Sequence, residues 1–420
     1  MKPKILVLAD WYAPGFKAGG LITALSNLAD SIGHVFELYI FTRDRDLTDK
    51  RPYPQVRSME WLSVGPARVM YTSDLSLRHL RERIFEVMPD IIYLNSFFSP
   101  LVIKTLFLRK LGMLPGSAVV LAPRGEFSPG AMKIKLLKKT AFTNFALRAG
   151  LYRNLIWQAT SDLEAENIAQ VLQSAGERGP LIHVASDLPS RDWLRATQQP
   201  LKEPKRAGGR FLFVSRISRK KNLLFALDTL ANLRGHVEFD IFGPIDDQSY
   251  WRDCRLRMKS LPSHVVARYK GPIPRENIQR AAQNYDFLLL PTQGENFGYI
   301  ILEAMAAGCP VILSDRTPWK HLSDRGLGWT LPLEDRTLWI RVLQQCIDLE
   351  PEIYAAMSYK TREFVESWAK SAHQSNQTTA LFNLALRSIA QTHDFDCPTA
   401  SNCAGYQASD PHRDTKEVSR

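Results

Sequence analysis

The stretch 286–315 constrains the fold of this chain more than any other, because it reads as strand, tight turn, helix and strand. Residues 286–290 form a short apolar run that ends near a proline and two glycines, which is typical of a buried strand leading into a turn. Residues 299–307 are rich in helix formers and stop at a glycine. A second apolar run, 311–313, follows. This order predicts an α/β fold.

Two glutamates stand out in this unit. Glu295 lies in the turn, and Glu303 lies inside the helix among apolar neighbours. A carboxylate in such surroundings is costly unless a hydrogen-bond donor satisfies it, and a ribose diol would do so. The first backbone N–H groups of the helix, near 296–299, carry the positive end of the helix dipole and can bind phosphate. The unit therefore predicts a nucleotide site.

The spacing of Glu295 and Glu303 around Asn296-Phe297-Gly298 resembles the E-x7-E motif of retaining GT-B glycosyltransferases of the GT4 type, the group 1 glycosyltransferase family. The strings LEAMA and GCPVI that surround Glu303 and follow it match the same family. The resemblance implies an α/β GT-B fold, in which two Rossmann-like domains face a central cleft. It covers about residues 4–390 and is strongest over 211–313.

Composition excludes several classes of protein. The chain has 420 residues, 45% of them hydrophobic and 23% charged, which is enough for two soluble domains. No run of eighteen apolar residues predicts a membrane span, and no apolar run near the amino terminus is long enough for a signal peptide, so we expect a cytoplasmic protein. The cysteines lack metal-ligand spacing and fit reduced structural thiols: Cys254, Cys309, Cys346, Cys397 and Cys403.

The alternation of strand and helix patterns divides the chain into two halves. Residues 1–198 are expected to form an amino-terminal acceptor domain, and residues 209–372 a nucleotide-sugar-binding domain. The polar stretch 189–209 is the best candidate for the linker between them. The resemblance implies that a terminal helix, 373–391, crosses back to the first domain. The polar tail 392–420 has no apolar period and is expected to be disordered.

In the second half, Arg216 and Lys221 follow the first strand and resemble the Arg-x4-Lys-Gly element of the family, with Asn222 in place of the glycine. Asn tolerates the left-handed conformation better than most residues, so the loop can persist. The resemblance assigns catalytic roles to Arg216, Lys221 and Glu295. It assigns donor binding to Gly19, Gly20, Gly243, Asn296, Phe297, Gly298, Tyr299 and Glu303.

In the first half, Gly19 and Gly20 follow the first predicted strand, at the edge of the sheet where ligands bind in open α/β folds. The family often has a histidine where this chain has Asn95, which can hydrogen-bond a sugar but cannot shuttle a proton. The resemblance places Asn95, Arg124 and Glu126 on the acceptor side of the cleft. The triplet Asp44-Arg45-Asp46 is of the type that holds a divalent metal elsewhere, but a polar loop explains it better, and no metal or other cofactor is expected.

The net charge of +11 implies an anionic partner. Between Glu126 and Asp162 there is no acidic residue, and cations alternate there with apolar residues. Such a segment can lie on an anionic membrane surface, or it can be an ordinary solvated helix face. On the first interpretation the protein is peripheral at the inner face of the cytoplasmic membrane, bound through Lys133, Lys135, Lys138 and Lys139.

The resemblance implies retaining transfer of a sugar from a nucleotide-diphosphate sugar to a hydroxyl on a sugar or lipid-linked acceptor, in the synthesis of bacterial lipopolysaccharide or exopolysaccharide. A nucleotide-sugar epimerase of the same fold is the main alternative. A nucleic-acid-binding protein fits less well, because the cations sit at strand-to-helix turns and no nucleic-acid module is recognisable, so no nucleic-acid partner is expected. A non-catalytic relative fits poorly with the motif residues that are retained.

Overall fold

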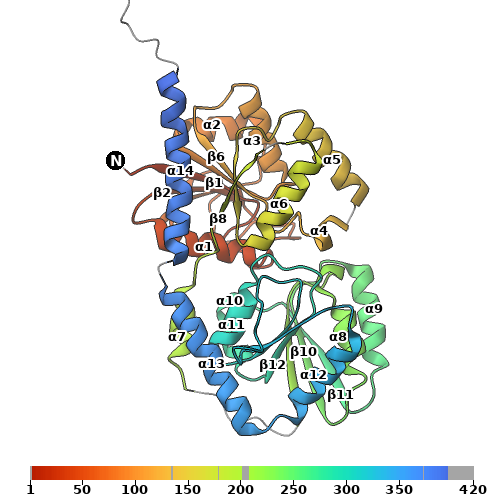
Figure 1. Cartoon of the computed structure of the whole chain (residues 1–420). Helices are drawn as coiled ribbons and strands as arrows, with labels where there is room; N and C mark the ends of the chain where they lie inside the picture. Colours follow the sequence, from red (N-terminus) through yellow and green to blue (C-terminus); the bar gives the residue numbers. More distant parts are fainter. Residues whose placement is uncertain (1, 134–135, 178, 201–207, 372, 396–420) are drawn as a thin grey trace, which may run out of the picture.

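The computed structural model describes residues 2–133, 136–177, 179–200, 208–371 and 373–395. Within these residues the chain folds into two α/β domains, one above the other in Figure 1, each built around a mostly parallel sheet. Lys135 and the tail beyond 395 lie outside the described residues. The predicted fold class, α/β with two Rossmann-like domains, is confirmed.

The first domain contains a sheet in the order β3-β4-β2-β1-β5-β6-β7-β8, in which only the pair β3 and β4 is antiparallel. Its inner strands, such as β1, β5 and β6, are buried on both faces, which explains their nearly continuous apolar sequences. The strands are β1 (Lys4–Leu8), β2 (Glu37–Arg43), β3 (Trp61–Val64), β4 (Ala67–Thr72), β5 (Ile91–Asn95), β6 (Ala118–Ala122), β7 (Ile156–Ala159) and β8 (Leu181–Val184).

Helices cover both faces of this sheet. One face packs against α1 and α14, and the other against α2, α3, α5 and α6. The helices are α1 (Gly20–Ile32), α2 (Leu77–Val87), α3 (Pro100–Lys110), α4 (Pro129–Lys133), α5 (Leu136–Arg148), α6 (Asp162–Ser174) and, from the end of the chain, α14 (His373–Phe395). The sequence patterns did not predict α3 or β3.

The second domain contains a parallel sheet in the order β11-β10-β9-β12-β13-β14. The buried side chains of its strands and helices form a single large hydrophobic core. Its strands are β9 (Gly209–Val214), β10 (Val237–Phe242), β11 (Val265–Gly271), β12 (Phe287–Leu290), β13 (Val311–Ser314) and β14 (Gly328–Leu331). Its helices are α8 (Leu223–Leu230), α9 (Gln248–Lys259), α10 (Arg275–Ala282), α11 (Tyr299–Ala306), α12 (Arg336–Asp348) and α13 (Pro351–Lys370), with one 3₁₀ turn, η1 (Arg219–Lys221). Of these, α9 was not predicted.

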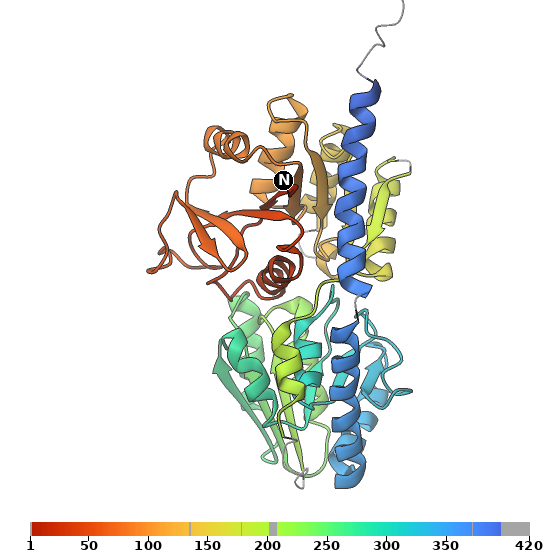
Figure 2. The same ribbon diagram turned by 90° about the vertical axis from the view of Figure 1, so that its left-hand side faces the viewer.

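The end of the chain runs along both domains. Figure 2 shows α13 beside the second domain and α14 continuing along the same side of the first. On α14, Phe382 is fully buried and its ring meets those of Phe36 and Tyr93 at centroid distances of 5.7 and 5.4 Å. The helix extends through Phe395, so the expectation of a disordered tail from residue 392 is wrong for 392–395.

The stretch 189–209 is not a plain linker, because it contains α7 (Arg191–Thr197). Trp193 on this helix is fully buried and packs between Tyr299 and Trp368, with ring centroids 5.8 Å from each. The polar composition of the stretch concealed a helix that is held by one large aromatic side chain. Residues 201–207 lie outside the described part.

Candidate active site

Residues that follow the carboxyl ends of strands in both sheets line the space between the domains, which is the edge where ligands bind in open α/β folds. In the second sheet the strand order reverses between β9 and β12. These two strands are neighbours, so the loops that follow them begin side by side at the same edge of the sheet. The first loop carries Arg216 and Lys221, and the second carries Glu295. The topology therefore brings together two motifs that are far apart in the sequence.

The loop after β12 turns sharply into α11 at Gly298. Its φ is +81°, and a Cβ atom there would lie 2.7 Å from Ile301 Cδ1 and 2.9 Å from Glu295 Cγ, so glycine is required. No side chain caps the amino terminus of α11, and Gly298, Tyr299 and Ile300 at its start line the cleft. A phosphate or a sugar hydroxyl could accept from them.

Glu295 forms an ion pair with Lys221, and the two side chains are mostly buried. Burial raises the pKa of Glu295, but the charges of Lys221 and Lys220 more than offset it, and the pKa of this carboxyl lies below its usual range. The stem of Lys220 passes beside Gly294, 3.4 Å from where a Cβ atom would stand. Burial and the neighbouring Lys221 lower the pKa of Lys220 to about 8. Three ionised groups therefore share one small volume.

Arg216 completes the cationic side of this group. Its Nη1 donates to Asp246 Oδ2 at 3.2 Å, and its side chain is 41% exposed, so the guanidinium can reorient toward a ligand. Gly243, at the end of β10, lies against the same loop: a Cβ atom on it would stand 1.9 Å from the carbonyl oxygen of Ser215. Only glycine allows β10 to turn this close to the strand end that bears Arg216.

Glu303 lies one helical turn inside α11 and is almost fully buried. Its Oε1 is 3.5 Å from Arg275 Nε, on the start of α10. Burial raises the pKa of Glu303 to about 7, although Arg275 opposes the rise. Arg275 also donates to Asn27 Oδ1 of the first domain at 3.2 Å, so it links the two domains beside the carboxylate.

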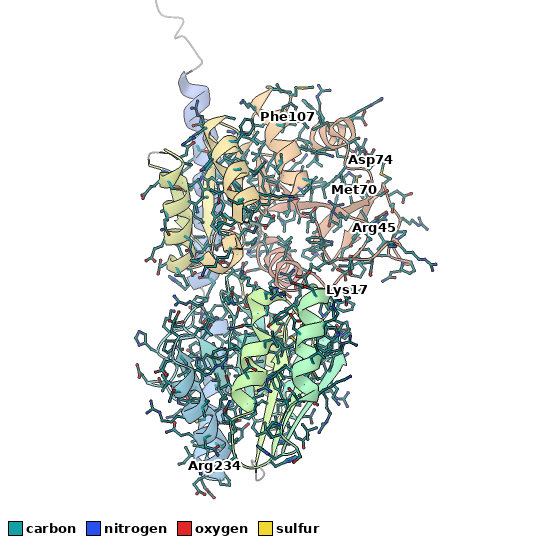
Figure 3. All side chains as sticks on the ribbon, turned by 90° about the vertical axis from the view of Figure 1, so that its right-hand side faces the viewer. Lys17, Arg45, Met70, Asp74, Phe107 and Arg234 are labelled. Carbon is teal, nitrogen blue, oxygen red and sulfur yellow. The ribbon has the colours of Figure 1, made fainter. Side chains whose placement is uncertain are left out.

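The glycine-rich loop after β1 forms the opposite wall. Asp46 Oδ2 accepts from the backbone N–H groups of Phe16 and Lys17 at 2.7 and 3.0 Å, and this fixes the loop ahead of Gly19 and Gly20. Figure 3 shows Lys17 where the two domains meet. The triplet Asp44-Arg45-Asp46 thus has a structural use. Among the described residues, no group of three or more His, Cys, Asp or Glu gathers to hold a metal ion.

Arg124 lies at the end of β6 with φ +58° and is held by three acceptors. It donates to Asn95 Oδ1 at 3.0 Å, to the Tyr93 hydroxyl at 2.8 Å and to Asp187 Oδ1 at 2.7 Å. Asn95 is therefore fully buried behind Arg124 and does not line the cleft, which departs from its predicted acceptor-side position.

Glu126, the third predicted acceptor-side residue, reaches the cleft wall but is also occupied. Its carboxylate accepts from the Ser96 hydroxyl at 2.7 Å and from the backbone N–H groups of Phe97 and Phe98. We conclude that Glu126 fixes the backbone of the loop after β5.

These walls enclose a cleft of about 550 Å³ between the domains. This volume falls within the range of about 300–1,000 Å³ that is common for small-molecule sites. Except for Asn95, every predicted site residue lines it: Gly19, Gly20, Arg124, Glu126, Arg216, Lys221, Gly243, Glu295, Asn296, Phe297, Gly298, Tyr299 and Glu303.

Sequence reasoning missed three cleft residues of consequence. Lys220 stands next to the predicted Lys221, and the run of cations from 219 to 221 was its signal. Arg275 and Asp187 carried no signal, because their roles depend on partners more than twenty residues away. Lys139 was predicted to face a membrane, but it reaches inward, donates to the carbonyl oxygen of Ala131 and lines the cleft.

Comparison with known proteins identifies the second domain. Residues 208–348 match the model of the family described as glycosyl transferases group 1. The second domain belongs to this family. A D-inositol 3-phosphate glycosyltransferase from Corynebacterium diphtheriae is 26% identical to the chain over 129 residues, which are 30% of either protein. The matched part thus spans less than a third of that relative's own length.

Solved structures are similar to this chain over both of its domains. HepE from Anabaena in complex with UDP and glucose is 16% identical, with a TM-score of 0.60 over 94% of this chain and 100% of that one. WaaG, described as involved in lipopolysaccharide biosynthesis, is 13% identical, with a TM-score of 0.62 over 90% and 98%. The fold is GT-B.

Proposed function

We propose that this protein is a retaining glycosyltransferase, which moves a sugar from a nucleotide-diphosphate sugar to a hydroxyl acceptor in the cleft between its domains. One observation carries the proposal: Arg216, Lys221, Glu295 and Glu303 converge on a single cleft beside the open start of a helix. The glycosyltransferase family of the second domain supports it.

Each group has a distinct task in this proposal. The buried carboxylate of Glu303 accepts hydrogen bonds from the ribose hydroxyls, which replace Arg275 as its partner. Arg216, Lys220 and Lys221 neutralise the diphosphate. The N–H groups at the start of α11 bind the phosphate or the sugar. Glu295, held ionised by Lys221, accepts from hydroxyls of the sugar that is transferred.

The difficult step is departure of the diphosphate as the anomeric carbon becomes oxocarbenium-like. The bond between this carbon and the phosphate oxygen breaks with both electrons going to the oxygen. The acceptor oxygen then bonds to the carbon on the same face, and its proton passes to the leaving phosphate. Because Glu295 is tied to Lys221, this same-face route suits the site better than a glutamate nucleophile. We propose that the protein's own cations, rather than a metal, stabilise the leaving group.

Biosynthesis of a bacterial surface polysaccharide or lipopolysaccharide is the proposed setting. The fold shared with WaaG, which is described as involved in lipopolysaccharide biosynthesis, supports this choice. A UDP-sugar is the donor to test first, because HepE is described with UDP.

A direct test incubates the protein with UDP-glucose, GDP-mannose or ADP-glucose and a panel of p-nitrophenyl glycosides as acceptors. Proton NMR records the anomeric configuration of the first product. We expect one donor to yield an α-glycoside from its α-linked sugar, with a loss of about 10²-fold or more in Lys221→Ala. Nucleotide release with an isomerised free sugar and no glycoside would instead identify an epimerase, and a β-glycoside would contradict retention.

We further propose that the protein binds the surface of an anionic membrane through α4 and α5. Lys133 and Lys138 are exposed there, and Leu137 and Phe145 are 85% and 73% exposed. Apolar side chains among cations match the interior and the charge of an anionic leaflet. None of the described helices is long and apolar enough to cross a membrane.

Sedimentation with phosphatidylglycerol vesicles at low salt tests this part by itself. We expect binding that falls several-fold in Leu137→Glu and persists in Phe107→Glu. Phe107 is the matched control because it is 45% exposed on α3, far from the junction of the domains in Figure 3. Equal binding to uncharged phosphatidylcholine vesicles, or no binding at all, would overturn the membrane proposal and leave the transferase proposal intact.

A further inference from the structure

A second cavity of about 470 Å³ lies beside the cleft, on the side of the sheet away from β10. The first domain contributes the start of α4 and the first turns of α6 to its walls. The second domain contributes the loops that follow β12, β13 and β14. Gly125, Glu295 and Asn296 line both cavities, so the two meet at the glutamate assigned to the transferred sugar.

The domains touch at this meeting point. A Cβ atom on Gly125 would lie 2.8 Å from Asn296 Cβ, and one on Gly130 would lie 2.5 Å from the carbonyl oxygen of Gln293. Glycine at these two positions is what allows the first domain to approach the loop that carries Glu295. The second cavity therefore has a fixed position relative to the donor site.

Two buried oxygen atoms in the lining accept no hydrogen bond, Asn296 Oδ1 and Asp315 Oδ1. Arg316 Nε lies 3.3 Å from Asp315 Oδ1 but does not donate to it. Buried acceptors without donors are costly, and a hydroxyl group of a ligand would satisfy either oxygen once its side chain turned toward the cavity. Half of the other polar side chains in the lining are uncharged and can donate as well as accept: Ser128, Ser161, Asn167, Asn222 and Gln293.

The charged groups of the cavity favour a neutral ligand. Arg316 donates to Glu334 at 2.6 Å, and it also lies close to Asp315, so its charge is already compensated. Lys133 is the other cation of the lining, and Glu334 lies near enough to interact with it. A phosphate or carboxylate ligand would meet more acidic than basic side chains here, four against two, whereas sugar hydroxyls suit the amides and hydroxyls.

From this geometry we infer that the second cavity is the acceptor subsite and that it takes a neutral saccharide chain. The saccharide lies between α6 and the loops after β13 and β14, and its reacting hydroxyl enters the donor cleft beside Glu295. The inference rests on the proposed function and deepens it, because it names the class of acceptor.

A printed array of neutral and acidic glycans, probed with fluorescently labelled protein in the presence of UDP, tests the inference. Asn167→Trp fills the cavity from α6, and Glu334→Trp fills it from the second domain. Gln173→Trp is the matched control, because it places the same ring on an exposed position of α6 that lines neither cavity. Calorimetric titration with UDP, GDP and ADP is run on every variant.

We expect the intact protein to bind to spots of neutral glycans. Binding should fall at least tenfold in both cavity variants and persist in the control, while the affinity of every variant for the nucleotide stays within twofold of the parent. Binding that is equal in all variants, that is confined to acidic glycans, or that is absent from the whole array would overturn the inference. If the intact protein bound none of UDP, GDP and ADP, the proposed function itself would be contradicted, so the two failures are distinguishable.

Discussion

At the scale of single residues, the carboxyl group of Glu303 is buried where its charged form is disfavoured. Burial raises the pKa of Glu303 from 4.5 to about 7. As pH rises through this window the unfolded chain loses the proton first, so the carboxyl stabilises the fold below pH 4.5 and this contribution is gone above pH 7. A ligand-binding role for Glu303 would explain why the fold tolerates this cost.

Glu303→Gln should therefore be more stable than the parent protein at pH 8, and this gain should be smaller at pH 5. At 1.36 kcal/mol per pH unit the full difference is ~3 kcal/mol, and we expect a gain of ~1–3 kcal/mol over the parent protein at pH 8. Urea unfolding of both proteins at the two pH values measures it. An equal effect at both pH values would show that the Glu303 carboxyl has no raised pKa.

Lys220 gives the donor site a second pH dependence. Since the pKa of Lys220 is about 8, its positive charge is lost above pH 8 and diphosphate affinity should fall between pH 7 and 9. Lys220→Arg keeps its charge in this range, so its affinity should decline several-fold less. Calorimetry with UDP at pH 7, 8 and 9 compares the two proteins, and parallel declines would rule out Lys220 as the titrating group.

The sequence motifs predicted which residues line the cleft between the domains, and their roles there stay a prediction. Arg216, Lys221 and Glu295 follow the ends of two neighbouring strands, and Glu303 lies on the helix after the second, so the motifs were enough to predict that these four line one cleft. Asn95 was placed correctly at a strand end, but Arg124 covers it, and a contact between strands leaves no trace in a sequence.

At the scale of elements, α7 is a helix that the polar composition of residues 189–209 did not predict. In this polar stretch the helix is anchored by the large buried ring of Trp193, with Ala196 beside it in the same core. Trp193→Ala should cost ~3–5 kcal/mol of unfolding free energy, because a large buried ring is replaced by a cavity beneath α11. Arg195→Ala, on the exposed side of the same helix, should change it by less than ~0.5 kcal/mol. A loss below ~1 kcal/mol in Trp193→Ala would contradict this packing role.

The loop after β1 is held in place by hydrogen bonds to the Asp46 carboxylate. Because both of its oxygens accept backbone N–H groups, Asp46→Ala should loosen the loop and weaken donor binding several-fold, whereas EDTA should leave donor binding by the parent protein unchanged. Calorimetry with and without EDTA separates the two effects. Loss of binding in EDTA that is restored by Mg²⁺ or Mn²⁺ would show that a metal takes part.

At the scale of the whole molecule, the alternation of strands and helices was enough to predict two α/β domains, because parallel strands buried on both faces produce long apolar runs. It could not predict how the domains meet. That contact is made by single residues such as Gly125 against Asn296 and Arg275 beside Asn27, and by α14, which returns to the first domain.

The central claim is that the cleft between the domains binds a nucleotide diphosphate. Isothermal calorimetry with UDP, GDP and ADP tests it most directly, using the parent protein, Glu303→Ala, Arg216→Ala and the control Arg219→Ala. Arg219 is exposed, pairs with Asp247 and Asp253, and does not line the cleft. We predict that one nucleotide binds to the parent and the control, and at least tenfold more weakly to the other two variants. No binding of any nucleotide to the parent protein, or equal binding to all four proteins, would contradict the claim.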